Sequence, residues 1–266
     1  MQIRDHVGTG KPAIILHPAG TVITFDELEA RANRLAHYFR QQGLREGDAV
    51  AILMENNEHM HAAMWAARRS GLYYVPINTH LTPAEAAYII DNSGASAIVG
   101  SAALRKVCEN LGEHLPDGLP ATLLIADDHL DGWQRYPECV ADQPDTPIDD
   151  EWEGDLLQYS SGTTGRPKGI KPPSVGGPLG APTMFTMLLQ GLYGANESTR
   201  YLSPAPLYHA APSGWTTAIH RLGGTVVVLE RFDAIEFLAA IEQHRITMTQ
   251  VVPTTTSASI VEAQRA

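Results

Sequence analysis

Residues 159–170 read YSSGTTGRPKGI and bring hydroxyl side chains, glycines and a lysine together in one short run. Glycine can adopt backbone angles that are closed to other residues, so successive N–H groups in such a run are able to turn toward a single anion. Charge-assisted hydrogen bonds contribute about 1.5–3 kcal/mol each, so a handful of them suffices to hold a polyphosphate. The predicted anion site consists of Ser160, Ser161, Gly162, Thr163, Thr164, Gly165, Arg166, Pro167, Lys168 and Gly169.

The order of residues in this run excludes two common phosphate-binding motifs. A Walker-type loop needs glycine directly before the lysine and serine or threonine directly after it, whereas here Pro167 precedes Lys168 and Gly169 follows it. The glycine spacing also fails the dinucleotide-binding fingerprint. A surface loop without a ligand is the alternative interpretation, and the ordered string of hydroxyls, glycines and a lysine argues against it.

The composition of the whole chain favours a globular α/β protein without a generic attraction to polyanions. The chain has 266 residues, of which 44% are hydrophobic, enough for one large domain or two small ones. It carries 19 basic and 30 acidic residues and a formal net charge of -11, which disfavours nucleic acid and anionic lipid as partners. Any bound anion must therefore be held locally.

The sequence gives no signal for membrane insertion or for disulfide bonding. The first residues, MQIRDHVGTGKP, lack an apolar signal core, and no apolar run approaches the roughly 18 residues that a membrane span requires. Cys108 and Cys139 are the only cysteines, and their separation gives neither a disulfide framework nor a zinc spacing. We therefore expect buried or idle thiols in a soluble, cytoplasmic protein without an integral membrane segment.

Capping signals and apolar runs alternate along the chain. Thr24 with Glu27 and Thr82 with Glu85 each fit a capping box, and Asn56 is expected to cap a helix between them. Strands are predicted at 13–17, 21–24, 48–54, 73–77, 97–99, 122–125, 156–159, 201–202, 225–229 and 248–252. This alternation predicts an α/β fold in which layered mixed or parallel sheets carry helices on both faces.

One segment interrupts this alternation of predicted helices and strands. Residues 142–155 are acidic and contain prolines, which predicts an exposed connector between two lobes at about 1–141 and 156–266. The strand predicted directly after the connector leads into the run that begins at Tyr159. In open α/β sheets, ligands gather where loops leave the carboxyl ends of strands, so position and composition both favour a binding loop there.

The run YSSGTTGRPKG resembles the signature of the adenylate-forming, or AMP-binding, enzymes, which include acyl- and aryl-CoA synthetases, firefly luciferases and peptide-synthetase adenylation domains. Other segments follow in the family's order: residues 23–28 (ITFDEL), 69–78 (RSGLYYVPIN) and 206–209 (PLYH) look like its early acidic block, its valine-proline strand and its aromatic-histidine block. The resemblance covers nearly the whole chain. It is closest to acyl-CoA synthetases and fatty-acid–CoA ligases, and it corresponds to the amino-terminal part of their large domain.

The resemblance implies a reaction in two halves, in which a carboxylic acid and ATP give an acyl-adenylate and pyrophosphate, and coenzyme A then displaces AMP. Lys168 and the residues around it would hold the leaving β- and γ-phosphates, and Mg²⁺ would share that charge with Ser160 as a ligand. His209 would be catalytic where the carboxylate meets the nucleotide. One wall of an acyl or aryl pocket would consist of His209, Ala210, Ala211, Gly214 and Trp215. A homo-oligomer is a further expectation.

The chain departs from the family pattern in two places. Residues 171–177, KPPSVGG, stand where relatives commonly carry a threonine or serine and a histidine. The chain also stops at Ala266, before the family's adenine, ribose and hinge blocks and its small carboxy-terminal lid domain. We therefore expect a truncated chain that cannot turn over alone, produced by a reading-frame shift near Thr254 or Thr255 or by another truncation. The alternatives are a noncatalytic remnant and a luciferase-like or peptide-synthetase adenylating enzyme.

Overall fold

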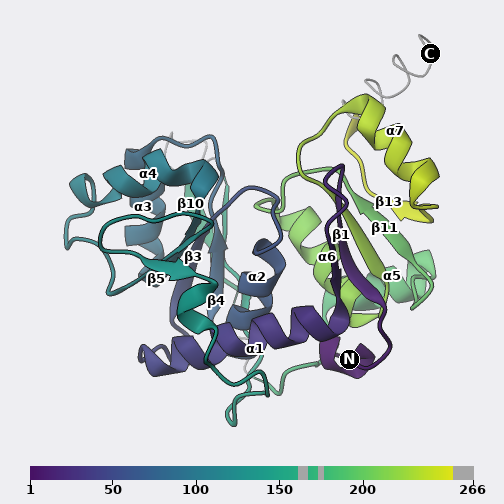
Figure 1. Cartoon of the computed structure of the whole chain (residues 1–266), viewed down its shortest axis with the longest axis horizontal. Helices are drawn as coiled ribbons and strands as arrows, with labels where there is room; N and C mark the ends of the chain where they lie inside the picture. The colour runs from purple at the N-terminus through teal and green to yellow at the C-terminus, as the bar shows by residue number, and fades with distance from the viewer. Residues whose placement is uncertain (161–166, 173–176, 254–266) are drawn as a thin grey trace. The chain divides into compact units, whose positions relative to one another are not determined.

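The computed structural model describes residues 1–160, 167–172 and 177–253 (Figure 1). The chain folds into two compact units: Met1–Glu29, Asn56–Glu58 and Gly180–Ala266 form the first, and Ala30–Glu55 and His59–Leu179 form the second. The units therefore interleave along the sequence. Residues 142–155, which we expected to separate two lobes, lie within the second unit.

The first unit is built on a five-stranded sheet in the order β13-β11-β12-β1-β2. β1 (Pro12–His17) pairs in parallel with β12 (Thr225–Leu229) and turns back antiparallel on β2 (Val22–Thr24), as the hairpin signal predicts. β11 (Arg200–Ser203) pairs in parallel with both β12 and β13 (Met248–Thr249). Every residue of β12 is buried, which is why the sequence shows an unbroken apolar run there instead of alternation.

Helices cover both faces of this sheet. α6 (Ala210–Arg221) connects β11 to β12, and α7 (Ala234–Gln243) connects β12 back to β13. Because the two connections run in opposite directions across the sheet, right-handed crossovers place α6 and α7 on opposite faces (Figure 1). α7 packs on the sheet through Phe237 and Ala240, and α5 (Met184–Tyr193) packs against α6. A short 3₁₀ helix, Ile3–His6, precedes β1.

The second unit is built on a six-stranded parallel sheet in the order β7-β6-β5-β3-β4-β8. Its strands are β3 (Ala49–Leu53), β4 (Tyr73–Pro76), β5 (Ala95–Ser101), β6 (Thr122–Ala126), β7 (Gln134–Tyr136) and β8 (Asp155–Leu156). The strand predicted at 156–159 is divided, because β8 joins this sheet and a separate strand starts at Gln158. Between them, buried Leu157 donates its backbone N–H to the carbonyl oxygen of Tyr74.

The helices of the second unit confirm two of the three predicted caps. They are α1 (Phe25–Gln41), which begins in the first unit, α2 (Met60–Arg69), α3 (Pro83–Ser93) and α4 (Arg105–Asn110), with 3₁₀ turns at Ala102–Leu104, Leu111–Glu113 and Glu138–Val140. The capping boxes of Thr24 with Glu27 and of Thr82 with Glu85 are both present. The prediction for Asn56 is wrong, because His59 occupies the N-cap position of α2.

The acidic segment 142–155 is anchored by arginines. Arg40 Nε donates to both carboxylate oxygens of Asp150 at 3.0 Å, and Arg68 forms a 2.7 Å ion pair with Glu153, in which both side chains are buried. A Cβ atom on Gly154 would lie 2.2 Å from the carbonyl oxygen of Leu72, so only glycine fits there. The expectation of an exposed connector is therefore wrong for its carboxyl-terminal end, which basic side chains hold against the unit.

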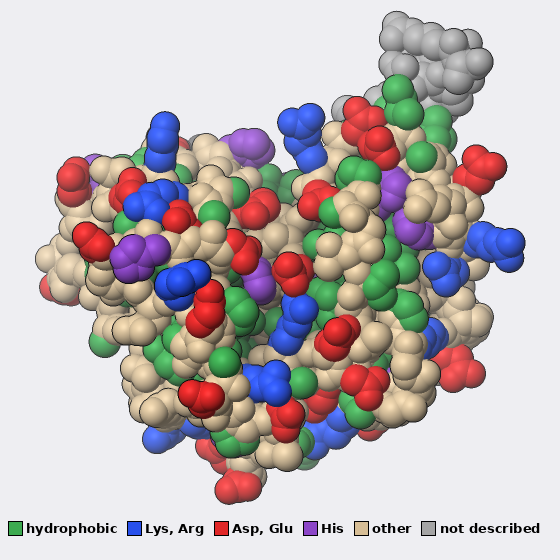
Figure 2. Space-filling model, in the orientation of Figure 1, with side chains coloured by type: hydrophobic (Ala, Val, Ile, Leu, Met, Phe, Trp, Pro, Cys, Tyr) green, Lys and Arg blue, Asp and Glu red, His purple; other side chains and the backbone are tan. Residues whose placement is uncertain are grey.

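Acidic and basic side chains are interspersed over the face of the molecule shown in Figure 2. Within the described residues, no helix combines the length and the apolar character that a membrane span requires. Burial raises the pKa of the Cys108 thiol to about 12 and that of the Cys139 thiol to about 11, so both stay protonated at neutral pH.

Candidate functional site

The run that begins at Tyr159 enters and leaves through a two-stranded antiparallel hairpin. β9 (Gln158–Ser160) pairs with β10 (Lys168–Ile170), with Lys168 directly opposite Ser160. Directly paired residues point to the same face of a hairpin, and both of these side chains are exposed. The hairpin thus brings together the two ends of the predicted anion site. Its middle part, Ser161, Gly162, Thr163, Thr164, Gly165 and Arg166, lies outside the described residues.

Gly169 has a steric role inside this hairpin. It lies opposite Tyr159, and a Cβ atom built on it would lie 3.0 Å from Cζ of that ring and 3.1 Å from its hydroxyl oxygen. Such contacts are tighter than most that real Cβ atoms make, so the absence of a side chain lets the ring lie across β10 without being displaced. The sequence predicted Gly169 as part of the anion site, and the structure adds this packing reason for a glycine there.

Helix α3 supports both strands of the hairpin. The Tyr88 hydroxyl donates to the carbonyl oxygen of Pro167 at 3.3 Å, and the Tyr159 hydroxyl donates to Asn92 Oδ1 at 2.8 Å. Tyr88 and Asn92 are four residues apart on α3 and therefore share one face of the helix. Neither residue stands out in the sequence, although their spacing on a predicted helix is visible there.

The segment after β10 is held in a similar way. The Tyr73 hydroxyl donates to the carbonyl oxygen of Pro172 at 3.1 Å, and Lys171 Nζ lies 4.4 Å from the centre of the Tyr73 ring. Burial raises the pKa of Tyr73, and it raises the pKa of Tyr159 to about 12. Both phenols therefore keep their protons at neutral pH and remain hydrogen-bond donors.

His209 lies in the first unit, at the N-cap position of α6. Its ring centroid is 4.5 Å from that of Tyr208, and the ring remains accessible to solvent. Desolvation by the surrounding atoms lowers the pKa of His209, and the positive end of the helix dipole acts in the same direction. The imidazole is therefore neutral at pH 7 and can accept or donate a hydrogen bond.

Asn56 holds the segment that leads to His209. Its side chain is 7% exposed; Nδ2 donates to the carbonyl oxygens of Leu229 at 2.8 Å and Ala205 at 3.3 Å, and Oδ1 accepts from Leu207 N at 2.8 Å. One amide thus satisfies three backbone groups. This role differs from the helix cap that the sequence predicts for Asn56.

The predicted pocket residues lie on the first turns of α6. Ala210 and Ala211 are partly exposed there. A Cβ atom on Gly214 would lie 2.5 Å from the Phe185 ring of α5, and Trp215 stacks on Tyr201 at 5.8 Å between centroids. Gly214 and Trp215 thus take part in helix and ring packing, and their part in an acid pocket stays a prediction.

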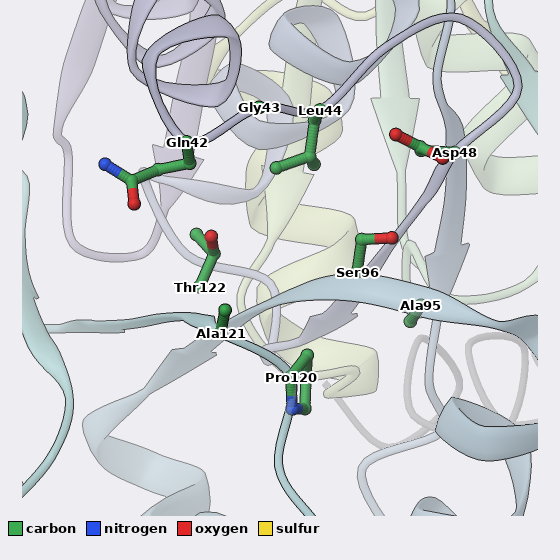
Figure 3. A pocket seen from close by; sticks show the side chains of 9 residues that line it. All are labelled: Gln42, Gly43, Leu44, Asp48, Ala95, Ser96, Pro120, Ala121 and Thr122. Carbon is green, nitrogen blue, oxygen red and sulfur yellow. The ribbon is translucent and has the colours of Figure 1, made fainter.

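A cavity of about 400 Å³ in the second unit contains none of the predicted site residues. Its polar lining comes from Gln42, Asp48, Ser96 and Thr122 (Figure 3). Gln42 follows α1, and the other three residues stand at the amino ends of β3, β5 and β6, whereas ligands of open α/β sheets gather at the carboxyl ends. Within the described part of the chain, no three His, Cys, Asp or Glu side chains are arranged to hold a metal ion.

Family comparison identifies the class of protein that this fold and these motifs define. The profile of the AMP-binding enzyme family matches residues 4–265, so the chain belongs to that family. It is 33% identical over 250 residues to feruloyl-CoA synthase from Amycolatopsis sp, a match that covers 91% of this chain and 46% of that protein. It is 27% identical over 261 residues to crotonobetaine/carnitine–CoA ligase from Escherichia coli O1:K1, with 91% and 48% covered.

The solved structures agree on the fold. The N-terminal domain of FACL13 from Mycobacterium tuberculosis superposes with a TM-score of 0.79 at 23% identity, covering 97% of this chain and 63% of that chain. The resemblance and the α/β fold class predicted from the sequence are therefore confirmed. The chain spans about half the length of the curated relatives that it matches.

Proposed function

We propose that this chain carries the pyrophosphate-binding and acid-facing part of an ATP-dependent, AMP-forming carboxylic acid–CoA ligase. One observation carries the proposal: hairpin β9–β10 sets the exposed Lys168 opposite the exposed Ser160, at the two ends of the run 160–169. Membership of the AMP-binding family and the CoA ligases among its relatives support it.

In this reaction Lys168 would stabilise the leaving group. The β- and γ-phosphates of ATP depart as pyrophosphate, and negative charge grows on their oxygens as the acyl-adenylate forms. The Lys168 ammonium and the hydroxyl and N–H groups of residues 160–169 would donate to those oxygens. Removing one such donor from a preorganised site typically costs about 2.7–4 kcal/mol of transition-state stabilisation.

Ser160 fits a minor part in binding Mg²⁺. Magnesium keeps several waters and is usually held by one or two protein oxygens together with the phosphates of the substrate. Ser160 offers one exposed hydroxyl oxygen at the end of β9, and the described residues hold no larger cluster of ligands. When bound, the ion would supply charge neutralisation at the β- and γ-phosphates.

His209 and the start of α6 would receive the carboxylic acid. The free N–H groups of a helix N-terminus attract a carboxylate, and the neutral imidazole of His209 adds a donor without a full charge. A carboxylate held there keeps its own charge and remains nucleophilic. Ala210 and Ala211, on the first turn of α6, would lie beside the acyl or aryl group.

The chain alone would bind pyrophosphate without completing turnover, since it spans about half of its relatives' length. Titration calorimetry with pyrophosphate tests the first part. Lys168→Ala should abolish measurable binding, whereas Lys106→Ala, at an exposed position on α4, should leave it unchanged. Equal binding by the wild type and K168A would overturn the proposal. Acid-dependent exchange of labelled pyrophosphate into ATP by the 266-residue chain would contradict the proposed lack of turnover.

A further inference from the structure

We propose that three tyrosine side chains, Tyr73, Tyr88 and Tyr159, fix the backbone at both ends of the run 160–169 and thereby present Lys168 to pyrophosphate. They would act as positioning residues, because their contacts are with the hairpin and the segment after it. This inference rests on the proposed function, since it concerns the same anion.

Hairpin β9–β10 needs support from outside. Each of its strands has three residues, and an isolated two-stranded ribbon is marginally stable in water. β10 is exposed along its length, and Gly169 in its centre offers no side chain to pack. The position of Lys168 therefore depends on what holds the backbone on either side of it.

Tyr88 holds the residue directly before Lys168. Its ring is partly buried against the core of the second unit, so the hydroxyl projects from a fixed base. It donates to the carbonyl oxygen of Pro167, and that carbonyl is the only backbone hydrogen-bonding group proline has. This hydrogen bond is thus the direct means of fixing where β10 begins.

Tyr159 joins β9 to β10 and to α3. Its ring packs over Gly169, which follows Lys168, and its hydroxyl donates to Asn92 on the same face of α3 that carries Tyr88. One face of α3 therefore fixes the carbonyl before Lys168 and the ring that covers the residue after it. This arrangement holds the pairing of Lys168 with Ser160.

Tyr73 gives the two neighbouring lysines different roles. The ammonium of Lys171 lies over the Tyr73 ring, while the hydroxyl of Tyr73 holds Pro172. Tyr73 itself is 5% exposed and belongs to β4, so the chain leaving β10 is fixed to the central sheet. Lys171 is thus an anchor, and Lys168 remains the lysine paired with Ser160.

The test is pyrophosphate affinity in Tyr→Phe variants of the 266-residue chain, each of which removes one hydroxyl and keeps the ring. For Tyr88→Phe we expect affinity to fall about threefold to tenfold, the factor by which the loss of one hydrogen bond ordinarily changes an equilibrium. Tyr38→Phe is the matched control, because Tyr38 lies on α1 beside Cys139 in the same unit. It should bind like the wild type, and thermal midpoints should agree among the three proteins.

A double-mutant cycle separates positioning from general weakening. Tyr159→Phe and Asn92→Ala each remove one side of the same hydrogen bond, so the double variant should bind no more weakly than either single variant. Asn92 is exposed, so its replacement leaves the core intact even if a tyrosine variant unfolds. Acetylation of the four lysines, read by mass spectrometry, supplies a local signal, since pyrophosphate should protect Lys168 and leave Lys106 reactive.

The outcomes separate the two proposals. If the wild-type chain neither binds pyrophosphate nor protects Lys168 from acetylation, the proposed function fails and the positioning role fails with it. If the wild type binds but Tyr88→Phe, Tyr159→Phe and Tyr73→Phe bind equally well, the proposed function stands and the positioning role is overturned. Independent, additive losses in the cycle of Tyr159 and Asn92 would also overturn it.

Discussion

The two parts of the candidate site are held by different means. Hairpin β9–β10 is exposed, and tyrosine hydroxyls from neighbouring elements hold the backbone around it. The segment leading to His209 is largely buried, and the single amide of Asn56 joins backbone groups of that segment to the carbonyl of Leu229 at the end of β12. The difference shows where damage should appear: loss of a support at the hairpin should alter ligand affinity, whereas loss of Asn56 should alter stability.

Asn56→Leu should have the largest effect. It leaves the N–H of Leu207 and the carbonyl of Leu229 without their hydrogen-bond partner, and each buried unsatisfied group costs about 1–3 kcal/mol. We expect the free energy of unfolding to fall by about 3 kcal/mol, measured by urea titration followed by circular dichroism. Asn110→Leu, which removes an exposed hydrogen bond to the carbonyl of Lys106, should lower it by less than about 1 kcal/mol. Similar losses in both variants would remove the distinction between the two supports.

Acidification should act on the unit that carries the hairpin. Burial lowers the pKa of His61 on α2 from 6.5 to about 3, so the unfolded chain takes up a proton at higher pH than the folded chain does. The stability due to neutral His61 is complete above about pH 6.5 and falls as the pH decreases. Between pH 7 and pH 5 we expect a loss of about 2 kcal/mol from this group.

The variant His61→Asn tests this assignment, because the readout is the change between two pH values within one protein. Wild type and variant are unfolded with urea at pH 7 and at pH 5. The loss on acidification should be smaller in the variant by about 2 kcal/mol, even if the variant is less stable at both pH values. An equal loss in both proteins would show that other groups govern the acid sensitivity.

Local signals predicted much of the fold. The capping boxes at Thr24 and Thr82 involve residues three positions apart, and the apolar run 225–229 has the same bounds as β12. Such features are determined by neighbouring residues, so they are visible in the sequence.

The supports of the site could not be predicted in this way. Tyr88 and Pro167 are 79 residues apart, and Asn56 and Leu207 are 151 residues apart, so nothing near either residue indicates its partner. The sequence does not predict strand β10, because lysine and glycine are poor strand formers and the contacts that stabilise the strand come from α3. The burial of the acidic segment's carboxyl-terminal end is not visible in the sequence, because its arginine partners lie elsewhere in the chain.

A matched pair of glycines gives the smallest expected effects and the finest test of the comparison. In Gly214→Ala the new Cβ would lie 2.5 Å from the Phe185 ring of α5. Alanine favours the helix more than glycine does, but the steric overlap should outweigh this gain and lower the free energy of unfolding by about 1 kcal/mol. In Gly169→Ala the Tyr159 ring, at 3.0 Å, needs to move only a few tenths of an ångström. We expect a stability change below about 0.5 kcal/mol and a pyrophosphate affinity weaker by up to about threefold, because the displaced ring lengthens the 2.8 Å hydrogen bond from the Tyr159 hydroxyl to Asn92.

The two variants should therefore show opposite patterns of change in stability and in pyrophosphate affinity. Gly214→Ala should change the urea midpoint and leave pyrophosphate affinity unchanged, and Gly169→Ala should do the reverse. If Gly169→Ala loses stability but keeps its affinity, the hairpin is a structural element whose geometry the anion does not sense. If Gly214→Ala weakens pyrophosphate binding, the packing of α5 on α6 influences pyrophosphate affinity. The proposed contrast, in which one region governs stability and the other governs affinity, would then be wrong.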